Sequence, residues 1–572
     1  MVIHSIMAQH RKSKDLFKLL LSLLVLLVVV FILQFSFFRW DLTSEKRYSL
    51  SDNTKELVAS LDKDLYFEIY LAGDLPHGFT KLQKACMEML DELAVYSNKR
   101  ISYSLINPND IANPKKRNAF FQQLVERGLK PTSLQEKTKD GSLKQKIIIP
   151  GIIVHDQEKE TSIHLLKSVA GLSAEQNLNQ SIEALEYELT SAIRLLQDQK
   201  PKEIGFLTGQ GELNEYEVAD ITASLLQRYE VKRIGTKVLA QDYSRFAALL
   251  VAQPRKEFAK ADKYRLDQYI MHGGKVLWLI DEVEASMDSL TTKESTVAFY
   301  KPLNLEDQLF TYGVRINPDL IMDVQGQLIP IQTALPGEAP KFTPAPWYYS
   351  PLLKTPNTNP ITKGLNVVKA EFANSIDFVG KNNKLKRQVL LASSDYTKLE
   401  KVPVQISLDI VNRKMRPSDF PSGSRNIAVL LDGIFPSVFK NRAWKGIQKS
   451  TFKEQSVPTK MIVVSDGDII RNRVRGSGNN RQIEALGYDR YSRKTYGNSS
   501  FLLNCVDYLC DDKGWMNLRS REVKLRLLNP TKIRTKRVFW QMFNLVLPLF
   551  LLLIFALFRF YMRRRKFARL RK

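Results

Sequence analysis

Two long apolar stretches lie near the ends of the chain, and a much longer region of mixed apolar and polar positions separates them. The first, residues 16–38, reads LFKLLLSLLVLLVVVFILQFSFF, and the second, residues 538–558, reads VFWQMFNLVLPLFLLLIFALF. About 20 mainly apolar residues are enough for a helix to cross the hydrocarbon core of a bilayer. The pattern therefore predicts two transmembrane helices with a large region between them.

Each apolar stretch has one alternative interpretation. A cleaved signal peptide would have a shorter apolar core and a small-residue cleavage site, whereas the first stretch is long and runs into the aromatic and basic pair Arg39-Trp40. A buried core helix is the alternative for the second stretch, but the basic tail 559–572 follows it directly and ends the chain. We favour an uncleaved anchor at each end.

Basic flanks predict the orientation of both spans. The N-terminus, residues 1–15, carries Arg11, Lys12 and Lys14, and the tail carries Arg563, Arg564, Arg565 and Lys566. Positive flanks stay in the cytoplasm, so both termini are predicted to be cytoplasmic and the middle region to lie outside. The juxtamembrane segment 513–537 argues against this because it is also basic near its end, but the tail holds more charge.

The first part of the middle region, residues 39–175, alternates strand and helix patterns. LYFEIYLAG and ISYSLINP have strand character, and FTKLQKACMEMLDELAVYS between them has an apolar helical face. The segment 176–200 repeats apolar residues every three or four positions, as in an amphipathic connecting helix. This helix docks either on its own domain or on a partner helix.

The second part, residues 201–512, predicts a larger α/β domain. Apolar strands such as EIGFLTG, FAALLVAQP, KVLWLID, QVLLASS, NIAVLLDG and KMIVVSDGD alternate with helical stretches. That order is typical of a doubly wound, mainly parallel sheet. Residues 325–360 interrupt it with a long irregular segment rich in proline and aromatic residues, which is either an interaction loop or a lid packed over the sheet edge.

The net charge of +25 suggests nucleic acid or anionic lipid as a partner. The tail supplies a good part of that charge, and a basic strip beside a membrane binds anionic lipid headgroups. A nucleic-acid surface would interleave basic and aromatic residues on a folded face, and only Arg471 to Arg481 concentrates charge in the middle region, where a solvated loop is the favoured interpretation. We therefore predict membrane lipid as a partner and no nucleic acid.

The strongest candidate for a ligand site is a glycine turn in IGFLTGQGELN. Its residues are Thr208, Gly209, Gln210, Gly211 and Glu212. They follow a strand, and open α/β sheets bind ligands at the carboxyl ends of their strands. The turn lacks the third glycine of a dinucleotide fingerprint, and no P-loop occurs in the chain. A purely structural turn is the alternative interpretation.

The remaining chemistry-bearing residues form no recognisable centre. The 3 cysteines give neither a disulfide framework nor a CxxC pair, and none of the 6 histidines has a metal-ligand spacing. There is also no nucleophile elbow. Asp466, in the stretch SDGD after a predicted strand, is a candidate acid or ligand residue, with a solvated turn as its alternative. We predict no catalytic residue, no metal and no cofactor.

Several stretches resemble the GldG family, the gliding-motility-associated ABC transporter accessory proteins of Bacteroidetes. They are DLTSEKRYSLSDNTKELV, YLAGDLPHGFTKLQKACMEMLDELAVYS, LNQSIEALEYELTSAIRLL and IGFLTGQGELNEYEVADI. Related sequences often read Gly-His-Gly-Glu at the turn, so Gln210 in the histidine place weakens any catalytic or metal role there.

The resemblance implies a non-enzymatic inner-membrane protein with a periplasmic domain. Its implied partners are a separate ATP-binding ABC subunit and a permease subunit, with periplasmic motility or secretion proteins as further candidates. The implied fold is a core similar to class I glutamine amidotransferases and to the intraflagellar-transport-like family, without the nucleophile, and a smaller thioredoxin-like domain without a CxxC. A structural periplasmic scaffold and a glycan-acting enzyme are the alternative functions.

Overall fold

The structure is a computed structural model, and it divides the chain into two compact parts. One consists of Met1–Arg47 and Glu522–Lys572, and the other of Tyr48–Arg521, which we call the body. The described residues are 17, 19–28, 49–137, 143–169, 172–197, 200–293, 295–332, 341–356, 359–380, 384–413, 415–442, 451–476, 478–520 and 535–568.

Helix α14 (Arg537–Ala568) contains the predicted second span. The part Arg537–Arg565 is long and apolar enough to cross a membrane, and its large apolar side chains are exposed, which is consistent with membrane anchoring. Among the described residues it is the one helix of that kind, because the apolar helix near the N-terminus covers only Leu19–Val28. The prediction of two spans is therefore supported for one, and the rest of 16–38, apart from Phe17, lies outside the described residues.

The N-terminal part of the body is built on a four-stranded sheet of order β2-β1-β5-β6. Strand β1 is parallel to β2 and antiparallel to β5, which forms a hairpin with β6. The elements are α2 (Asp52–Ala59), β1 (Leu65–Ile69), α3 (His77–Tyr96), β2 (Ile101–Leu105), α4 (Pro114–Glu126), the hairpin β3 (Thr132–Lys137) and β4 (Leu143–Ile148), β5 (Gly151–His155) and β6 (Glu160–His164).

The predicted amphipathic helix is present but divides at Ala184 into α5 (Ala174–Glu183) and α6 (Leu185–Gln197). Leu185, Leu189 and Ile193 of α6 are buried in the same core as strands β1 and β5. Both halves contact α3, and α6 also contacts β5 and β6 of the sheet. Of the two possibilities for this helix, docking on its own domain is the one observed.

The larger sheet has nine strands in the order β13-β18-β22-β23-β10-β9-β7-β8, with β19 paired to β22. Strands β8, β7, β9, β10 and β23 are parallel, but β22 is antiparallel to both β23 and β19. The strand bounds are β7 (Glu203–Leu207), β8 (Glu230–Ile234), β9 (Ala248–Ala252), β10 (Val276–Leu279), β13 (Val314–Ile316), β18 (Ile376–Phe378), β19 (Leu385–Ala392), β22 (Asn426–Gly433) and β23 (Thr459–Val464).

The prediction of a mainly parallel sheet is thus wrong for its second half, although the mixed α/β class is observed. Parallel neighbours need a crossover, usually a helix. Among the described residues no α-helix lies between β19 and β22 or between β22 and β23. Antiparallel pairing follows for these strands. The resemblance of the larger domain to class I amidotransferases and that of the smaller domain to thioredoxin remain predictions.

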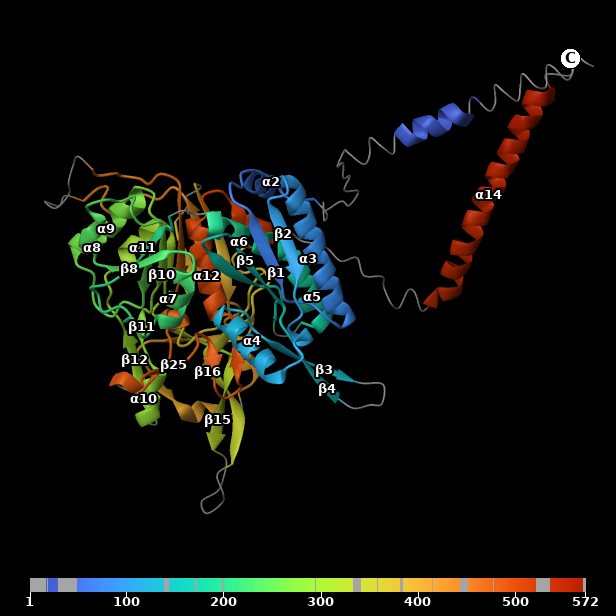
Figure 1. Ribbon diagram of the computed structural model, residues 1–572. Helices are drawn as coiled ribbons and strands as arrows, with labels where there is room; N and C mark the ends of the chain where they lie inside the picture. The colour runs from blue at the N-terminus through green and yellow to red at the C-terminus, as the bar shows by residue number, and fades with distance from the viewer. Residues whose placement is uncertain are drawn as a thin grey trace, which may run out of the picture. The chain divides into compact units, whose positions relative to one another are not determined.

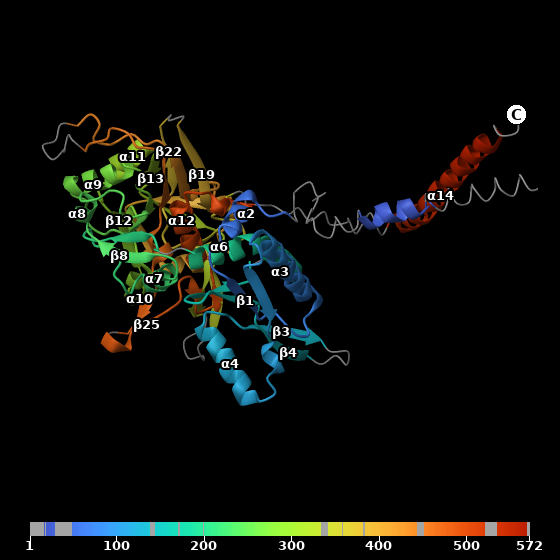
Figure 2. The same cartoon turned by 45° about the horizontal axis from the view of Figure 1, so that its top comes forward.

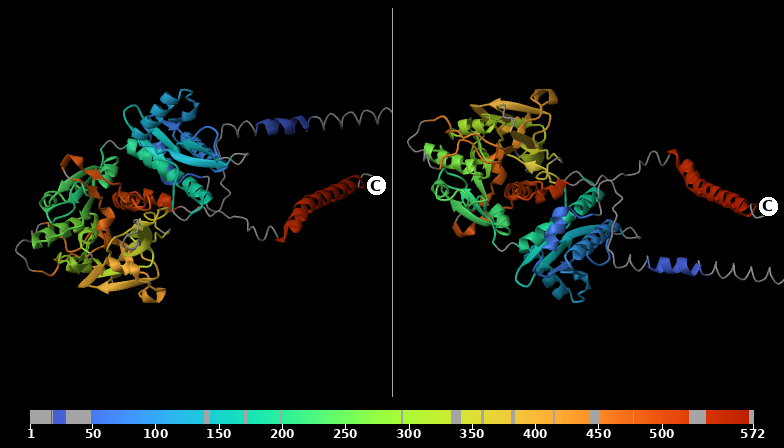
Figure 3. Two further views of the ribbon diagram at one scale, coloured as in Figure 1. Left: turned by 90° about the horizontal axis from the view of Figure 1, so that it is seen from below. Right: turned by 90° about the horizontal axis from the view of Figure 1, so that it is seen from above.

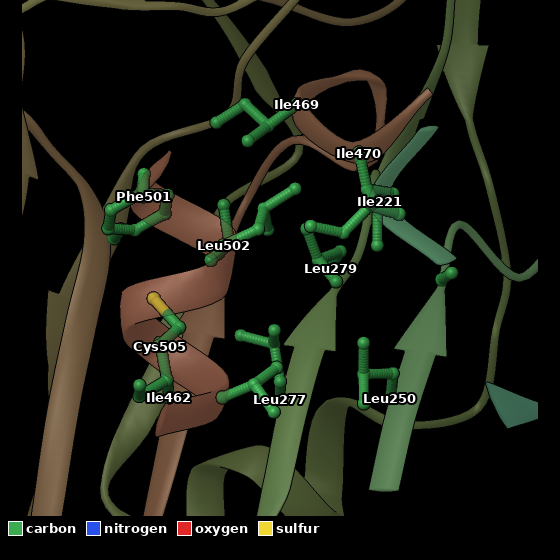
Figure 4. Packing of buried hydrophobic residues seen from close by; sticks show 14 of the residues in the cluster. Ile221, Leu250, Leu277, Leu279, Ile462, Ile469, Ile470, Phe501, Leu502 and Cys505 are labelled. Carbon is green, nitrogen blue, oxygen red and sulfur yellow. The ribbon is translucent and has the colours of Figure 1, made fainter. Parts of the chain in front are cut away.

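Helices cover both faces of the parallel strands. On one face α7 (Ala219–Leu226) and α12 (Asn498–Cys510) bury an apolar cluster against the sheet, and Figure 4 shows Phe501, Leu502 and Cys505 of α12 beside Leu277 and Ile462. On the other face lie α8 (Thr236–Leu239), α9 (Lys260–Met271) and α11 (Glu306–Tyr312). Figure 3 shows the blue and cyan elements of the smaller sheet and the green to orange elements of the larger sheet as two groups.

The proline- and aromatic-rich segment forms a long β-hairpin, which corrects the prediction of an irregular excursion. Strand β15 (Gly326–Gln332) pairs antiparallel with β16 (Phe342–Leu353), and Figure 1 shows the pair extending from the body. Trp347, Tyr348 and Tyr349 at its base are buried. The tip, 333–340, lies outside the described residues. Buried aromatic side chains at the base favour packing over a free interaction loop there.

Short elements complete the body. They are β11 (Val283–Glu284), α10 (Met287–Thr292), β12 (Ser295–Tyr300), β14 (Asp319–Asp323), β17 (Val368–Lys369), β20 (Thr397–Lys401), β21 (Val404–Ser407), β24 (Val474–Arg475), β25 (Gln482–Ile483), β26 (Tyr488–Asp489), β27 (Lys494–Thr495) and 3-10 turns at Pro108–Asp110, Leu408–Asn412, Pro417–Asp419, Gly467–Ile470, Gly478–Asn480 and Trp515–Ser520.

Candidate functional site

The carboxyl edge of the parallel strands is the place to look for a ligand site. The chain leaves β7 for β8 on one side and then returns to β9 on the other, so the strand order reverses between β7 and β9. Ligands of open α/β sheets bind in the crevice at such a switch point. The loops after β7 and β9 therefore occupy the position that a nucleotide or phosphate would take.

The turn after β7 is filled by one of its own side chains. One carboxylate oxygen of Glu212 accepts a hydrogen bond from the backbone nitrogen of Gln210 at 2.8 Å, whereas the other oxygen is buried and has no hydrogen-bond partner among the described residues. Successive backbone N–H groups form an anion-binding concavity. Here the anion is internal. Burial raises the pKa of Glu212, and the backbone N–H groups act in the opposite direction.

Residues of the loop after β9 and of α9 form hydrogen bonds with this turn. The backbone oxygen of Gln210 accepts hydrogen bonds from the backbone nitrogens of Arg255 and Lys256, at 2.9 and 2.8 Å. The side chain of Gln210, 7% exposed, donates to Asp262 in α9 at 3.3 Å. Gly209 and Gly211 have φ values of +128° and +73°, which favour glycine at both positions. The turn is therefore a packed joint between β7, the loop after β9 and α9.

Asp466 lies at the same sheet edge, after β23, and is fully buried. Its two oxygens accept hydrogen bonds from the backbone nitrogens of Glu371 and Asp468, at 2.7 and 2.8 Å. Burial, with the nearby carboxylates of Asp468 and Asp281, raises its pKa well above the ordinary value. A solvated turn is excluded as an interpretation of SDGD. Asp466 instead connects the loop after β23 to the loop that contains Glu371.

Asp466 belongs to a row of carboxyl groups that follow β10, β17 and β23. The row comprises Asp281, Glu282, Glu371, Asp466 and Asp468. Burial and the nearby carboxylates raise the pKa of Asp468 to about 7, and burial with the charge of Glu306 raises the pKa of Glu282 to about 8. Part of the row is therefore protonated at neutral pH.

Gln253, after β9, and Gly467 pack tightly into this row. The amide nitrogen of Gln253 donates to Asp281 at 2.8 Å, and Asp281 also accepts from the backbone nitrogen of Gly467 at 2.6 Å. A Cβ atom at Gly467 would lie 2.5 Å from Cγ of Gln253. The oxygen of the Gln253 amide is buried and has no hydrogen-bond partner, as has one oxygen of Glu282.

A cleft of about 150 Å³ opens beside the row. Its acidic side chains include Glu217, Asp288, Glu371 and Asp468, and Arg471 reaches three of them. The guanidinium of Arg471 lies 3.5 Å from Glu217, 3.4 Å from Asp288 and 3.6 Å from Asp468. An internal cation thus offsets part of the acidic charge, so the segment predicted as a solvated loop contributes to the cleft.

The structure places the predicted site residues on one edge but does not unite them. Strands β9 and β10 lie between β7, which precedes Thr208 to Glu212, and β23, which precedes Asp466. No group of three His, Cys, Asp or Glu side chains suited to a metal ion occurs among the described residues. All three cysteines are buried, and burial raises the pKa of Cys86 and of Cys510 to about 12.

Sequence reasoning missed Gln253, Asp281 and Glu371. Gln253 and Asp281 directly follow the apolar runs LLVA and LWLI, so the rule that named Thr208 to Glu212 could have found them. Glu371 carries no such signal, because it reaches Asp466 from 95 residues away. Of the predicted lipid-facing residues, Arg563, Arg564 and Arg565 lie near the end of α14, where Arg565 stacks on Tyr561, and Lys566 lies in the same helix.

Comparison with known proteins adds what the geometry leaves open. A family model described as ABC-type uncharacterized transport system matches residues 201–505, and a model for a domain of unknown function, DUF7088, matches residues 44–155. An uncharacterized protein of Borreliella burgdorferi is 21% identical over 571 residues, which is 97% of this chain and 99% of that protein. The solved N-terminal domain of mmIFT52 is 13% identical and covers 55% of this chain and 99% of its own, with a TM-score of 0.29, too low to carry an argument.

Proposed function

Because the chain belongs to the family of ABC-type uncharacterized transport systems, we propose that it is a membrane-anchored accessory subunit of an ABC transporter with no catalysis of its own. The observation that carries the proposal is the turn after β7. ABC transporters draw energy from ATP, and a P-loop binds the phosphates of ATP with its backbone N–H groups. In this chain Glu212 already occupies those groups at the switch point. ATP hydrolysis is therefore assigned to another subunit.

We extend the proposal to location. Helix α14 anchors the chain at its C-terminal end, and the apolar run of 16–38 supplies a second span at the N-terminal end. Arg563, Arg564 and Arg565 follow the second span, and such flanks remain cytoplasmic. The body then lies in the periplasm of a bacterial inner membrane. Support for gliding motility and the linked protein secretion comes from the GldG-like stretches alone.

Affinity purification of the full chain from its native membranes in mild detergent tests the accessory role. We expect an ATP-binding subunit and a polytopic permease subunit to elute with it in fixed ratio. A Glu212→Gln variant should retain both partners, since the proposal gives Glu212 no role outside the turn. A chain that elutes alone at every detergent concentration overturns the proposal.

One observation favours a second candidate, an enzyme acting on periplasmic glycan. Asp468 lines the cleft and has a pKa of about 7, raised by burial and nearby carboxylates, which suits a general acid. The isosteric Asp468→Asn change removes that acid while keeping the shape of the cleft. Unchanged motility and secretion in cells carrying this variant at normal protein level would eliminate the enzyme.

A further inference from the structure

The two ends of the body lie next to each other. Residues 49–54 follow the N-terminal apolar run in the sequence, and residues 511–520 precede α14. The amide nitrogen of Asn53, in α2, donates to the backbone oxygen of Lys513 at 3.4 Å. Figures 1 and 2 both show α2 beside α6, and the two helices are in contact. One helix of the N-terminal part therefore lies close to both ends.

Helix α6 holds the N-terminal end through Glu186. One oxygen of this carboxylate accepts hydrogen bonds from the backbone nitrogen of Ser51 at 2.7 Å and from the hydroxyl of Thr54 at 2.8 Å. Ser51 caps the N-terminus of α2, and its side chain accepts from the backbone nitrogen of Thr54. Glu186 is only 6% exposed. A buried carboxylate with two charge-assisted bonds is a strong fixing point.

Helix α6 also holds the C-terminal end of the body, through Tyr187 and Arg194. The hydroxyl of Tyr187 donates to the sulfur of Met516 at 3.1 Å, and the guanidinium of Arg519 lies 5.3 Å from the centroid of the Tyr187 ring. About two turns further along, the guanidinium of Arg194 lies 5.0 Å from the centroid of the Trp515 ring. Both Trp515 and Met516 are buried. Such cation–π contacts gain strength when they are desolvated.

Helix α6 also meets the larger domain at a polar cavity. The cavity, about 120 Å³, is lined on one side by Tyr187 and Glu188 and on the other by Arg228, Tyr229 and Asp507. Asp507 pairs with Arg228 and accepts a hydrogen bond from the hydroxyl of Tyr229 at 2.8 Å. Interfaces of this polar kind between domains permit relative motion more readily than apolar ones. Thus the joint between the two domains lies on the helix that holds both chain ends.

We propose that Glu186, Tyr187 and Arg194 form a clamp on α6 that couples the two chain ends leading to the apolar terminal helices. A displacement of either end is transmitted through α6 to the other end and to the polar joint between the domains. The clamp is a property of the body alone. The test of the clamp does not depend on a transporter partner, because all residues and contacts of the clamp lie within the body.

Hydrogen exchange of the full chain in lipid nanodiscs tests the clamp. Glu186→Gln removes the charge that holds Ser51 and Thr54 at the N-terminal end of the body. We expect amide exchange of 511–520 to accelerate roughly five-fold, together with that of 49–54, because contacts sharing one element couple. The matched control Glu175→Gln, on the exposed start of α5, should change neither segment.

The reciprocal variant covers the case in which Glu186→Gln fails to fold. Arg194→Gln loosens Trp515 at the C-terminal end and should accelerate exchange in 49–58 at the other end. Faster exchange in the distant segment in either variant supports the clamp. Acceleration confined to the segment that each side chain touches overturns it, since the two ends would then be held independently.

Discussion

The turn after β7 and the row of carboxyl groups after β10, β17 and β23 lie on the same edge of the sheet but differ in their electrostatics. After β7 the backbone N–H groups face an internal carboxylate, Glu212, so a site suited to an anion is closed by complementary charge. After β10, β17 and β23 five carboxyl groups lie together, three of them beside a Lys or Arg side chain, and burial keeps part of them protonated. At the first place one carboxylate accepts a backbone hydrogen bond although burial raises its pKa, whereas at the second place the pKa of Asp468 is about 7. A few side chains therefore decide whether the carboxyl edge of a parallel sheet excludes an external anion or titrates near neutral pH.

The largest effect is expected when the internal anion is removed. Glu212→Ala leaves backbone N–H groups of the turn without their acceptor, and such a loss costs about 2 kcal/mol. The vacated groups should then accept an external anion, so phosphate should raise the melting temperature of the variant and leave that of the wild type unchanged. Thermal unfolding of the full chain in detergent, with and without phosphate, measures both effects.

Glu215→Ala is the matched control for this change. Glu215 lies in the same loop but is exposed, so its loss should alter neither stability nor the response to phosphate. An equal response of the wild type and the Glu212 variant to phosphate would show that Glu212 does not close the turn.

The next effect concerns pH at the other place. The pKa of Asp468 is about 7 in the folded chain, raised by burial and then by Asp281, against an ordinary value of 3.8. Between these values the folded state binds more protons than the unfolded state, so the contribution is complete below pH ~4 and is lost as the pH rises toward ~7. We expect the free energy of unfolding to fall across this window as Asp468 loses its proton.

Asp468→Asn sharpens the same point, because the amide resembles the protonated acid. The variant should match the wild type near pH 3.5 and exceed its stability near pH 8, as measured by denaturant unfolding at both values. Parallel pH profiles for the two proteins would mean that Asp468 titrates normally.

The smallest effect is expected at Arg471, which is partly exposed. Arg471→Gln removes the cation near Glu217, Asp288 and Asp468, and partly exposed ion pairs contribute less than about 1 kcal/mol. The direction is informative, since the pKa of Asp468 should rise further. Carboxyl titration by NMR with selectively labelled aspartate in the body reports it. A lowered pKa would contradict the role of Arg471 as the internal cation.

The sequence predicted β7, β9, β10 and β23 of the parallel half of the large sheet but missed β8, whose residues are mainly polar. It failed for β19 and β22, whose apolar runs resemble the parallel strands although their direction is reversed. It located the turn after β7 and Asp466 but not Glu371, which joins Asp466 from a distant segment. Long-range packing decides which polar groups face one another. The periodicity of apolar residues along the chain does not predict such packing.

Photolabelling of the purified membrane complex with azido-ATP tests the central claim most directly, namely that this chain contributes no nucleotide site. The account predicts that the label appears on a separate subunit and that excess ATP competes it away, while this chain remains unlabelled. Specific, ATP-competed label within residues 203–282 of this chain would contradict the account.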